Sequence, residues 1–201
     1  MDNALITGAA GFIGSYTCRQ LLERGYRVTG IDNLNSYYDP ALKVKRLEIS
    51  GISKEDALSG QMVSSEKDPS YRFIKADIAD ASKMNEIFEK EKFDLVINLA
   101  AQPGARYSVE NPESYLHSNI TGFLNILEAC RHHPPKHLVY ASSSSVYGNN
   151  EKTPYAEDHI TDSPASLYGA SKKSNELMAY AYSHLYGIPM TGLRFFTVYG
   201  P

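Results

Sequence analysis

Short apolar runs alternate with longer amphipathic segments along most of this chain. A run that is apolar throughout is typical of a strand buried on both faces of a parallel sheet, whereas apolar side chains every three or four positions are typical of a surface helix. Strands are expected at 4–7, 27–32, 71–75, 94–101, 137–141 and 190–196. Helices are expected at 12–22, 40–49, 82–92, 113–130 and 167–186. This alternation predicts an α/β fold, a doubly wound parallel sheet with helices on both faces.

The stretch 33–70 departs from this regular pattern. Its helix at 40–49 would be short and basic, and the residues that follow, 51–70, are polar and contain Gly60 and Pro69. Glycine and proline interrupt regular structure, so we expect 51–70 to be a surface excursion. No chemistry can be assigned to it from the sequence.

The first predicted strand passes directly into a glycine-rich turn. Gly8, Gly11 and Gly14 follow the apolar run, and an amphipathic segment opens at Phe12. Gly8 would allow a sharp turn, Gly11 would let the backbone approach a pyrophosphate, and Gly14 would let the helix lie against the sheet. The unpaired N–H groups of the first helical turn would attract an anion. A Rossmann-type dinucleotide-binding unit begins in this way, although a tight turn without any ligand has the same pattern.

An aspartate closes the second predicted strand. Asp32 lies close to the point, about 20 residues after the glycine motif, where an acidic side chain meets the adenosine ribose of a dinucleotide. A carboxylate there would accept hydrogen bonds from the ribose hydroxyls and repel a 2′-phosphate, which favours NAD over NADP. The alternative is an aspartate that only caps a turn.

Two further stretches carry candidate chemistry. Serines occupy 142–145 at the carboxyl end of a central strand, the edge of an open α/β sheet where ligands bind. Tyr168 and Lys172 are four positions apart on a predicted helix, so they share one face. Taken singly, the serines could be a simple turn and the Tyr–Lys pair a chance occurrence.

The Tyr168–Lys172 spacing suggests an acid–base pair. A free tyrosine titrates near pH ~10, too high for a base at neutral pH. A cation about 5 Å away, at an effective dielectric constant of about 20, would stabilise the phenolate by roughly 3 kcal/mol, or about two pKa units. We therefore expect Lys172 to lower the pKa of Tyr168, with a serine hydroxyl steering the proton.

Composition narrows the classes of function. The 201 residues carry a net charge of −3, with 42% hydrophobic and 21% charged residues, so neither nucleic acid nor a membrane is an expected partner. Cys18 and Cys130 fall in predicted helices and are expected to be small buried residues in a reducing cytoplasm. The histidines show no metal-ligand spacing, and no metal is expected. Because the N-terminus runs straight into a strand, no signal peptide is expected.

Together these motifs resemble the extended short-chain dehydrogenase/reductase family, in particular its NAD-dependent nucleotide-sugar epimerases and dehydratases. The matching segments are Gly-Ala-Ala-Gly-Phe-Ile-Gly at 8–14, Asp32, Asp77-Ile78, Asn98-Leu99-Ala100-Ala101, the serine run 142–145, and Tyr168 with Lys172. By this resemblance the catalytic residues are Ser143, Tyr168 and Lys172. The implied NAD contacts are Gly8, Gly11, Phe12, Ile13, Gly14, Asp32, Asn33, Asp77, Ile78, Leu99, Ala100, Ala101, Tyr168, Lys172 and Phe196. The implied substrate contacts are Ser143, Ser144, Ser145, Tyr168 and Thr197.

The reaction can be narrowed within that group. The dehydratases that resemble this chain need an acidic pair directly after the catalytic hydroxyl, and here those positions are Ser144 and Ser145. Hydroxyl groups there would instead suit a sugar carboxylate. The segments 32–39, 100–108 and 193–201 are most similar to 4-epimerases that act on UDP-glucuronate. The resemblance thus implies C4 epimerisation through a transient 4-keto sugar, with a UDP-glucose 4-epimerase, a reductase or dehydratase, and a non-catalytic NAD-binding module as alternatives.

The chain stops immediately after its last predicted strand. Members of the resembled family continue well beyond this point, and that continuation supplies most of the nucleotide-sugar cleft. We therefore expect residues 1–201 to form the NAD-binding domain with its catalytic residues, and a C-terminal substrate domain to be missing by truncation. The resemblance further implies a homodimer formed through the helices at 113–130 and 167–186.

Overall fold

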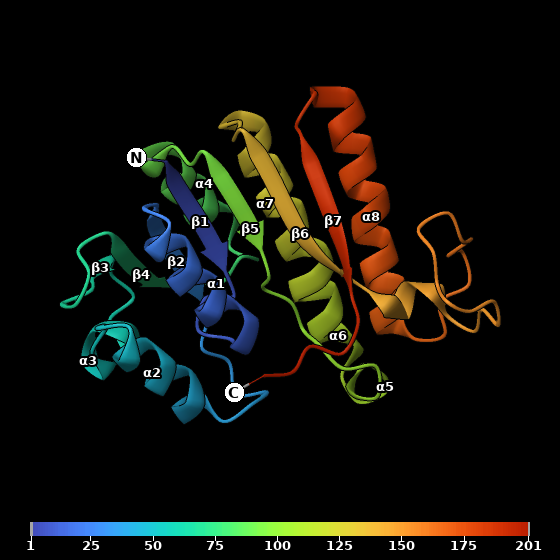
Figure 1. Cartoon of the computed structure of the whole chain (residues 1–201), viewed down its shortest axis with the longest axis horizontal. Coiled ribbons are helices and arrows are strands. Elements are labelled where there is room, and N and C mark those ends of the chain that lie inside the picture. Colours follow the sequence, from blue (N-terminus) through green and yellow to red (C-terminus); the bar gives the residue numbers. More distant parts are fainter. Residues whose placement is uncertain (1, 201) are drawn as a thin grey trace.

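A computed structural model describes residues 2–200, so Met1 and Pro201, the two ends of the predicted domain, lie outside the described residues. A seven-stranded sheet with the order β3-β4-β2-β1-β5-β6-β7 runs through the molecule (Figure 1). The strands are β1 (Asn3–Thr7), β2 (Arg27–Asp32), β3 (Val63–Ser64), β4 (Tyr71–Lys75), β5 (Leu95–Asn98), β6 (His137–Ser143) and β7 (Met190–Phe195). Neighbouring strands are parallel, except that β3 pairs antiparallel with β4. The doubly wound α/β prediction is confirmed.

The helices connect these strands. They are α1 (Phe12–Glu23), α2 (Pro40–Ile49), α3 (Lys54–Leu58), α4 (Ala81–Glu91), α5 (Tyr107–Glu110), α6 (Pro112–Tyr115), the π-helical turn η1 (Leu116–Thr121), α7 (Gly122–His132), the 3₁₀ turn η2 (Ser144–Tyr147) and α8 (Leu167–Tyr186). Within residues 2–200, no helix combines the length and the apolar character needed to cross a bilayer.

Two apolar cores lie on opposite faces of the sheet. The first joins the sheet to α4, α7 and α8 and contains Phe88, Phe123 and Ile126. The second joins it to α1, α2 and α3 and contains Leu21 and Leu47. The two cysteines are free and buried, one in each core, as predicted.

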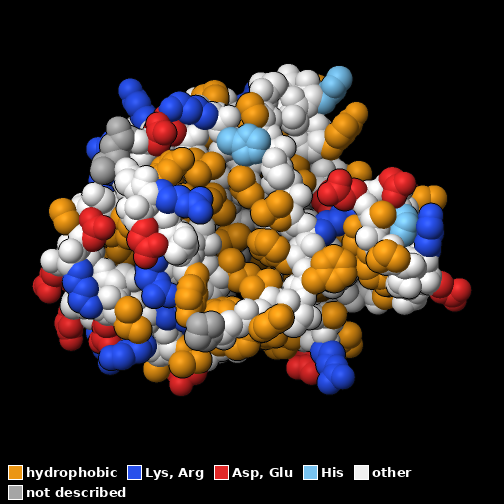
Figure 2. Space-filling view, in the orientation of Figure 1, with side chains coloured by type: hydrophobic (Ala, Val, Ile, Leu, Met, Phe, Trp, Pro, Cys, Tyr) orange, Lys and Arg blue, Asp and Glu red, His pale blue; other side chains and the backbone are white. Residues whose placement is uncertain are grey.

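The sheet is covered unequally. α1 lies over β1 and β2, and among residues 2–200 no helix covers β5, β6 and β7 on that side (Figure 1). Figure 2 shows apolar side chains gathered over this part of the face. Leu193 on β7 and Val198 after it are 40% and 47% exposed. An apolar sheet face of this kind is the surface against which another element packs.

Several details differ from the sequence prediction, among them the unpredicted helix α5 and a β6 that runs to Ser143. The predicted helix 113–130 consists of α6, η1 and α7, because a buried amide interrupts it: Asn119 in η1 accepts a hydrogen bond from the Gln102 N–H (2.7 Å) and donates to Ser171 Oγ (2.9 Å). The strand expected at 94–101 ends at Asn98. The stretch 51–70 contains α3 and β3, which are too short to produce a readable hydrophobic period.

Candidate active site

The ligand-binding crevice lies where the strand order changes direction. β1 is flanked by β2 on one side and β5 on the other, so the loops after these three strands open a crevice at their carboxyl ends. A cavity of about 860 Å³ occupies this position. All the predicted NAD contacts line it, together with Ser143 and Thr197 of the predicted substrate contacts. Ser144 and Ser145 belong to η2 and are outside the lining of this cavity.

The glycine turn leaves room for a ligand because side chains are excluded from it. A Cβ on Gly14 would lie 2.1 Å from the Gly8 carbonyl oxygen, and Gly8 itself has a positive φ of 70°. Gly11, the N-cap of α1, provides no side chain to cap the helix. Phe12, Ile13 and Gly14 of the first turn line the cavity, and the N–H groups of this turn have no side-chain cap, as a pyrophosphate site requires. These features fit a dinucleotide.

Asp32 is held in place by contacts that the sequence analysis missed. Its Oδ1 accepts hydrogen bonds from the Leu34 N–H (2.8 Å) and from Lys43 Nζ (3.0 Å), and its Oδ2 accepts one from the Ala10 N–H (3.2 Å). The Arg46 guanidinium lies close by, 3.4 Å from the Ala10 carbonyl oxygen. Lys43 offsets part of the negative charge that we expected to repel a 2′-phosphate.

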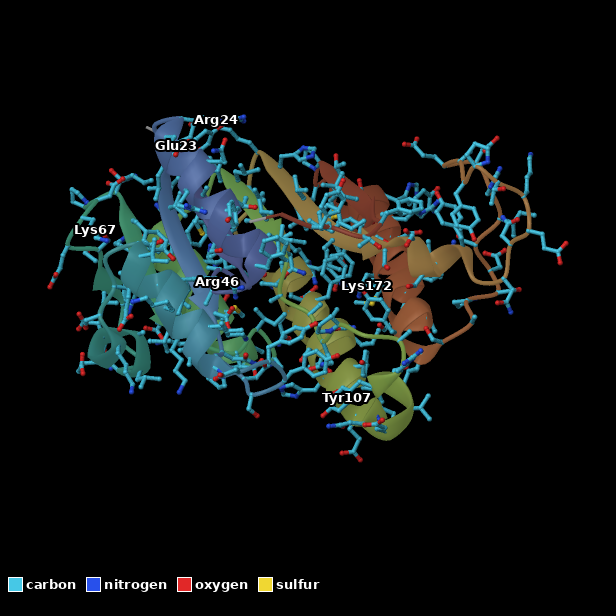
Figure 3. The ribbon with its side chains drawn as sticks, turned by 60° about the horizontal axis from the view of Figure 1, so that its bottom comes forward. Glu23, Arg24, Arg46, Lys67, Tyr107 and Lys172 are labelled. Carbon is cyan, nitrogen blue, oxygen red and sulfur yellow. The ribbon has the colours of Figure 1, made fainter. Side chains whose placement is uncertain are left out.

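The sequence carried a weak signal for these basic residues. Lys43 and Arg46 are three positions apart on α2, so they share one helix face, and both line the cavity. Figure 3 shows Arg46 beside the glycine turn, at the opposite end of the site from Lys172. The sequence does not show which way this face of α2 points. It lies toward Asp32 because α2 and α3 pack beside the sheet.

Asp77, in the loop that follows β4, also lines the cavity. Its carboxylate accepts hydrogen bonds from Asn33 Nδ2 (3.1 Å) and the Ala79 N–H (2.9 Å), and His117 Nε2 lies 3.3 Å away. Burial raises the pKa of Asp77, but these hydrogen bonds outweigh it, and the pKa is held below its usual range. Asp77 is therefore an ionised acceptor at neutral pH.

The proton-transfer groups meet at the carboxyl end of β6. Tyr168 and Lys172 extend from the start of α8, where Ser166 accepts a hydrogen bond from the Gly169 N–H as the N-cap. Lys172 Nζ donates to the Ala141 carbonyl oxygen (2.8 Å). Ser143, at the end of β6, accepts a hydrogen bond from the Ser145 N–H (3.1 Å), and its hydroxyl lies near enough to Tyr168 to lower the pKa of the phenol. A proton can pass between the phenol and the serine hydroxyl in this arrangement.

The expected lowering of the Tyr168 pKa by Lys172 is wrong for this structure. Burial raises the pKa of Tyr168 above its usual value, and the hydrogen bond from Ser143 opposes that rise. Lys172 is itself buried, which lowers its pKa to about 8, and its Nζ donates to a backbone carbonyl. The sequence argument placed an ammonium about 5 Å from the phenol and omitted the cost of burying both groups.

The burial of Lys172 makes stability depend on pH. Its folded pKa of about 8 lies below the ordinary 10.5, so between these values the unfolded chain binds more protons than the folded one. From this group we expect the free energy of unfolding to rise across that window, by at most about 1.4 kcal/mol per pH unit. Urea denaturation across the window measures it.

Lys172→Met should abolish this rise in the free energy of unfolding with pH. Lys173→Met is the control and should retain the rise, because it changes the neighbouring lysine, whose Nζ contacts Thr161 (2.6 Å). An identical pH dependence in the wild type and Lys172→Met would contradict the assignment.

Phe196 lines the cavity and lies beside the aromatic rings of Tyr147 and Tyr155. Its ring centroid lies 6.5 Å from that of Tyr147 and 6.1 Å from that of Tyr155, and those two rings stack on each other at 4.4 Å. Phe196 is 58% exposed, so one side of its ring is available for contact. Thr197 follows it at the mouth of the cavity.

Known proteins share this arrangement. The chain is 48% identical over 203 residues to UDP-glucuronate 4-epimerase 3 of Arabidopsis thaliana, a match that covers 99% of this chain and 43% of that protein. It is 49% identical over 197 residues to Protein CapI of Staphylococcus aureus, covering 98% of this chain and 54% of CapI. The chain thus spans about half the length of these curated relatives.

Solved structures agree with these relatives. The UDP-glucuronic acid 4-epimerase of Bacillus cereus, in complex with UDP-glucuronic acid and NAD, has a TM-score of 0.85 at 34% identity, over 99% of this chain and 58% of that one. The UDP-glucose 4-epimerase of Thermotoga maritima, with UDP-glucose, has a TM-score of 0.82 at 33% identity, over 99% and 57%. A family model described as the NAD dependent epimerase/dehydratase family matches residues 4–201. The chain belongs to the NAD dependent epimerase/dehydratase family.

Proposed function

We propose that the protein containing this chain is an NAD-dependent nucleotide-sugar 4-epimerase that interconverts UDP-glucuronate and UDP-galacturonate. The observation that carries this proposal is a single cavity that joins the glycine turn to Ser143, Tyr168 and Lys172. Support for the substrate comes from the names of the Arabidopsis and Bacillus cereus relatives.

The residues of this chain would move a proton and hold the sugar. Tyr168 would take the proton from the sugar O4 and return it when the hydride is delivered to the opposite face of C4, and the nearby Ser143 hydroxyl would steer that proton. Bound NAD supplies the acceptor and later the donor of the C4 hydride, so it would be restored in every turnover. The 4-keto sugar would turn over between these steps, with the hydroxyl groups of Ser143 and Thr197 offering contacts for its carboxylate.

The residues around the glycine turn would hold the cofactor. N–H groups of the first turn of α1 would bind the pyrophosphate and Asp32 the adenosine ribose, and Asp77, which lines the same cavity, would be a further cofactor contact. Lys172 would contact the nicotinamide ribose. Lys43 and Arg46 extend this set, because they line the same cavity beside Asp32.

Replacing Asp32 by Asn should weaken NAD binding by about 10- to 100-fold, since a hydrogen bond to a charged group contributes about 1.5–3 kcal/mol. Lys43 would lose its ion-pair partner at the same time, so binding of NADP should improve relative to NAD. Calorimetric titration of both dinucleotides measures the two effects.

Asp80→Asn is a matched control, because Asp80 caps α4 by accepting from the Lys83 N–H and does not line the cavity. An unchanged NAD affinity in Asp32→Asn would remove Asp32 from the proposed site.

Product analysis separates the alternatives. The full-length protein should convert UDP-glucuronate to its C4 epimer without net consumption of NADH. A 4-keto-6-deoxy product would indicate a dehydratase, and net NADH oxidation a reductase; Ser144 and Ser145 argue against the former, because neither can serve as an acid at neutral pH. Faster turnover of UDP-glucose would favour the activity named for the Thermotoga maritima neighbour. If the full-length protein binds NAD but turns over no substrate, the remaining interpretation is a non-catalytic NAD-binding module.

The remainder of the protein would complete the substrate cleft. The open apolar face of β5, β6 and β7 supports this, and so does a groove between α1 and the last residues, lined by Tyr16, Gln20 and Tyr199. We further propose a homodimer through α7 and α8, whose outer faces expose Leu124, Leu177 and Tyr180 by 39%, 59% and 75%. Light scattering of the full-length protein tests the dimer directly, and a monomer mass would exclude it.

A further inference from the structure

Three consecutive residues of β6 each lie against a different residue of α8, on successive turns of the helix. The Ala141 carbonyl accepts from Lys172 Nζ, and the Ser143 hydroxyl lies beside Tyr168. Between them, Ser142 Oγ donates to Glu176 Oε1 at 2.6 Å. Since Tyr168, Lys172 and Glu176 are four residues apart, they form one stripe along the helix. Two members of the stripe belong to the proposed catalytic set, and the third does not.

Glu176 is fixed by a bidentate ion pair. Arg194 on β7 donates from Nε to Oε1 (2.9 Å) and from Nη2 to Oε2 (3.0 Å). The same guanidinium donates to the Tyr147 hydroxyl (3.1 Å) in η2, and its Cζ lies 4.9 Å from the centroid of that ring. The pair therefore connects α8, the ends of β6 and β7, and the turn that follows Ser143.

This ion pair is largely buried but lies outside the cavity. The Glu176 and Arg194 side chains are 14% and 21% exposed, and neither lines the cavity, whereas Ser142 does. Bidentate Arg–carboxylate pairs fix geometry as well as charge. Proton transfer requires groups placed within about 0.5 Å of their productive geometry, and a misplacement of about 1 Å can cost about 100-fold in rate.

We propose that Glu176 and Arg194 are positioning residues that set the register of Ser142 and Ser143 against Tyr168 and Lys172 for the epimerase reaction. The expected change in kcat rests on the proposed function. The expected placement of the serines rests only on the contacts of Ser142, Glu176 and Arg194. Neither residue would touch substrate or cofactor.

Glu176→Gln in the full-length protein tests this proposal, because it keeps the side-chain volume and removes the charge. The kcat of UDP-sugar epimerisation should fall about 10- to 100-fold, while the KM of the UDP-sugar and the Kd of NAD stay within about twofold. Ser142→Ala, which removes the contact with β6 and leaves the ion pair intact, should lower kcat with the same selectivity even if Glu176→Gln folds poorly.

A second ion pair provides the matched control. Arg72 on β4 forms a bidentate pair with Glu91 on α4, with side chains 29% and 17% exposed, and neither residue lines the cavity. Glu91→Gln should destabilise the fold comparably and leave kcat within about twofold. If both glutamate variants lose kcat equally, or if Glu176→Gln retains it, the positioning role is wrong.

Crystal structures of the two variants give a readout that does not depend on the reaction. In Glu176→Gln, Ser142 and Ser143 should move away from α8, and in Glu91→Gln they should stay in place. Unmoved serines would overturn the inference whatever the reaction is. A wild type that epimerises no UDP-sugar would instead overturn the proposed function, and the crystallographic comparison would still decide the positioning role.

Discussion

Replacing Tyr168 by Phe should lower kcat for C4 epimerisation by about 1,000-fold and leave NAD affinity almost unchanged. The substitution removes only the hydroxyl that lies beside Ser143, and general acid–base catalysis contributes about 100- to 10,000-fold in rate. The phenyl ring would preserve the packing against Tyr115, whose ring centroid lies 6.1 Å away. Steady-state kinetics with UDP-glucuronate, combined with NAD titration, measures both quantities.

Tyr182→Phe is the matched control for this prediction. Tyr182 also belongs to α8, but its hydroxyl donates to Glu128 and it does not line the cavity. Its loss should leave kcat within about twofold. If Tyr168→Phe kept more than about a tenth of the wild-type rate, Tyr168 would not be the acid–base group.

Replacing Gly14 by Ala should abolish tight NAD binding. The new Cβ would lie 2.1 Å from the Gly8 oxygen and 2.8 Å from the Gly8 carbonyl carbon, so α1 must move away from the turn. Losing two hydrogen bonds from its first turn to a charged pyrophosphate, at about 1.5 kcal/mol or more each, corresponds to a loss of affinity of at least about 100-fold. The strain should also lower the free energy of unfolding by about 1–3 kcal/mol.

Gly25→Ala distinguishes a loss of binding from a general loss of stability. Gly25 lies in the middle of the α1–β2 connection with a φ of +82°, and a Cβ there meets nothing within 4 Å. The left-handed conformation should cost about 1–2 kcal/mol of stability without affecting the cofactor turn. Calorimetric titration of NAD into the two variants makes the comparison. Wild-type NAD affinity in Gly14→Ala would mean that the turn does not hold the dinucleotide.

The fold was largely predictable because its signals are local. The buried strands β1, β5 and β6 are continuous apolar runs, and α4 and α7 have clear helical periods. The predicted elements are wrong where the local sequence signal is weak or where contacts with distant residues change the local structure. β3 has two residues, and the π-helical turn η1 follows from Asn119, which is buried against Gln102 and Ser171 from other parts of the chain.

The candidate site was predictable to a similar degree. The predicted NAD contacts line one cavity because motifs at the carboxyl ends of parallel strands converge at one edge of the sheet. Lys43 and Arg46 were missed because only the packing of α2 brings them to Asp32 and to the Ala10 carbonyl, and their own segment carries no motif. Ser144 and Ser145 belong to η2 and do not line the cavity, so their substrate role stays a prediction.

The sequence by itself determined the features that depend on short separations along the chain. These are the glycine turn, the acidic end of β2, the shared helix face of Tyr168 and Lys172, and the strand–helix alternation. Tertiary structure alone decided the strand order, the pairing of Lys43 with Asp32, the ion pair between Glu176 and Arg194, and the direction of the Tyr168 pKa shift. The physical reason is that burial and long-range contacts set charge environments, and neither can be read from spacing within one segment.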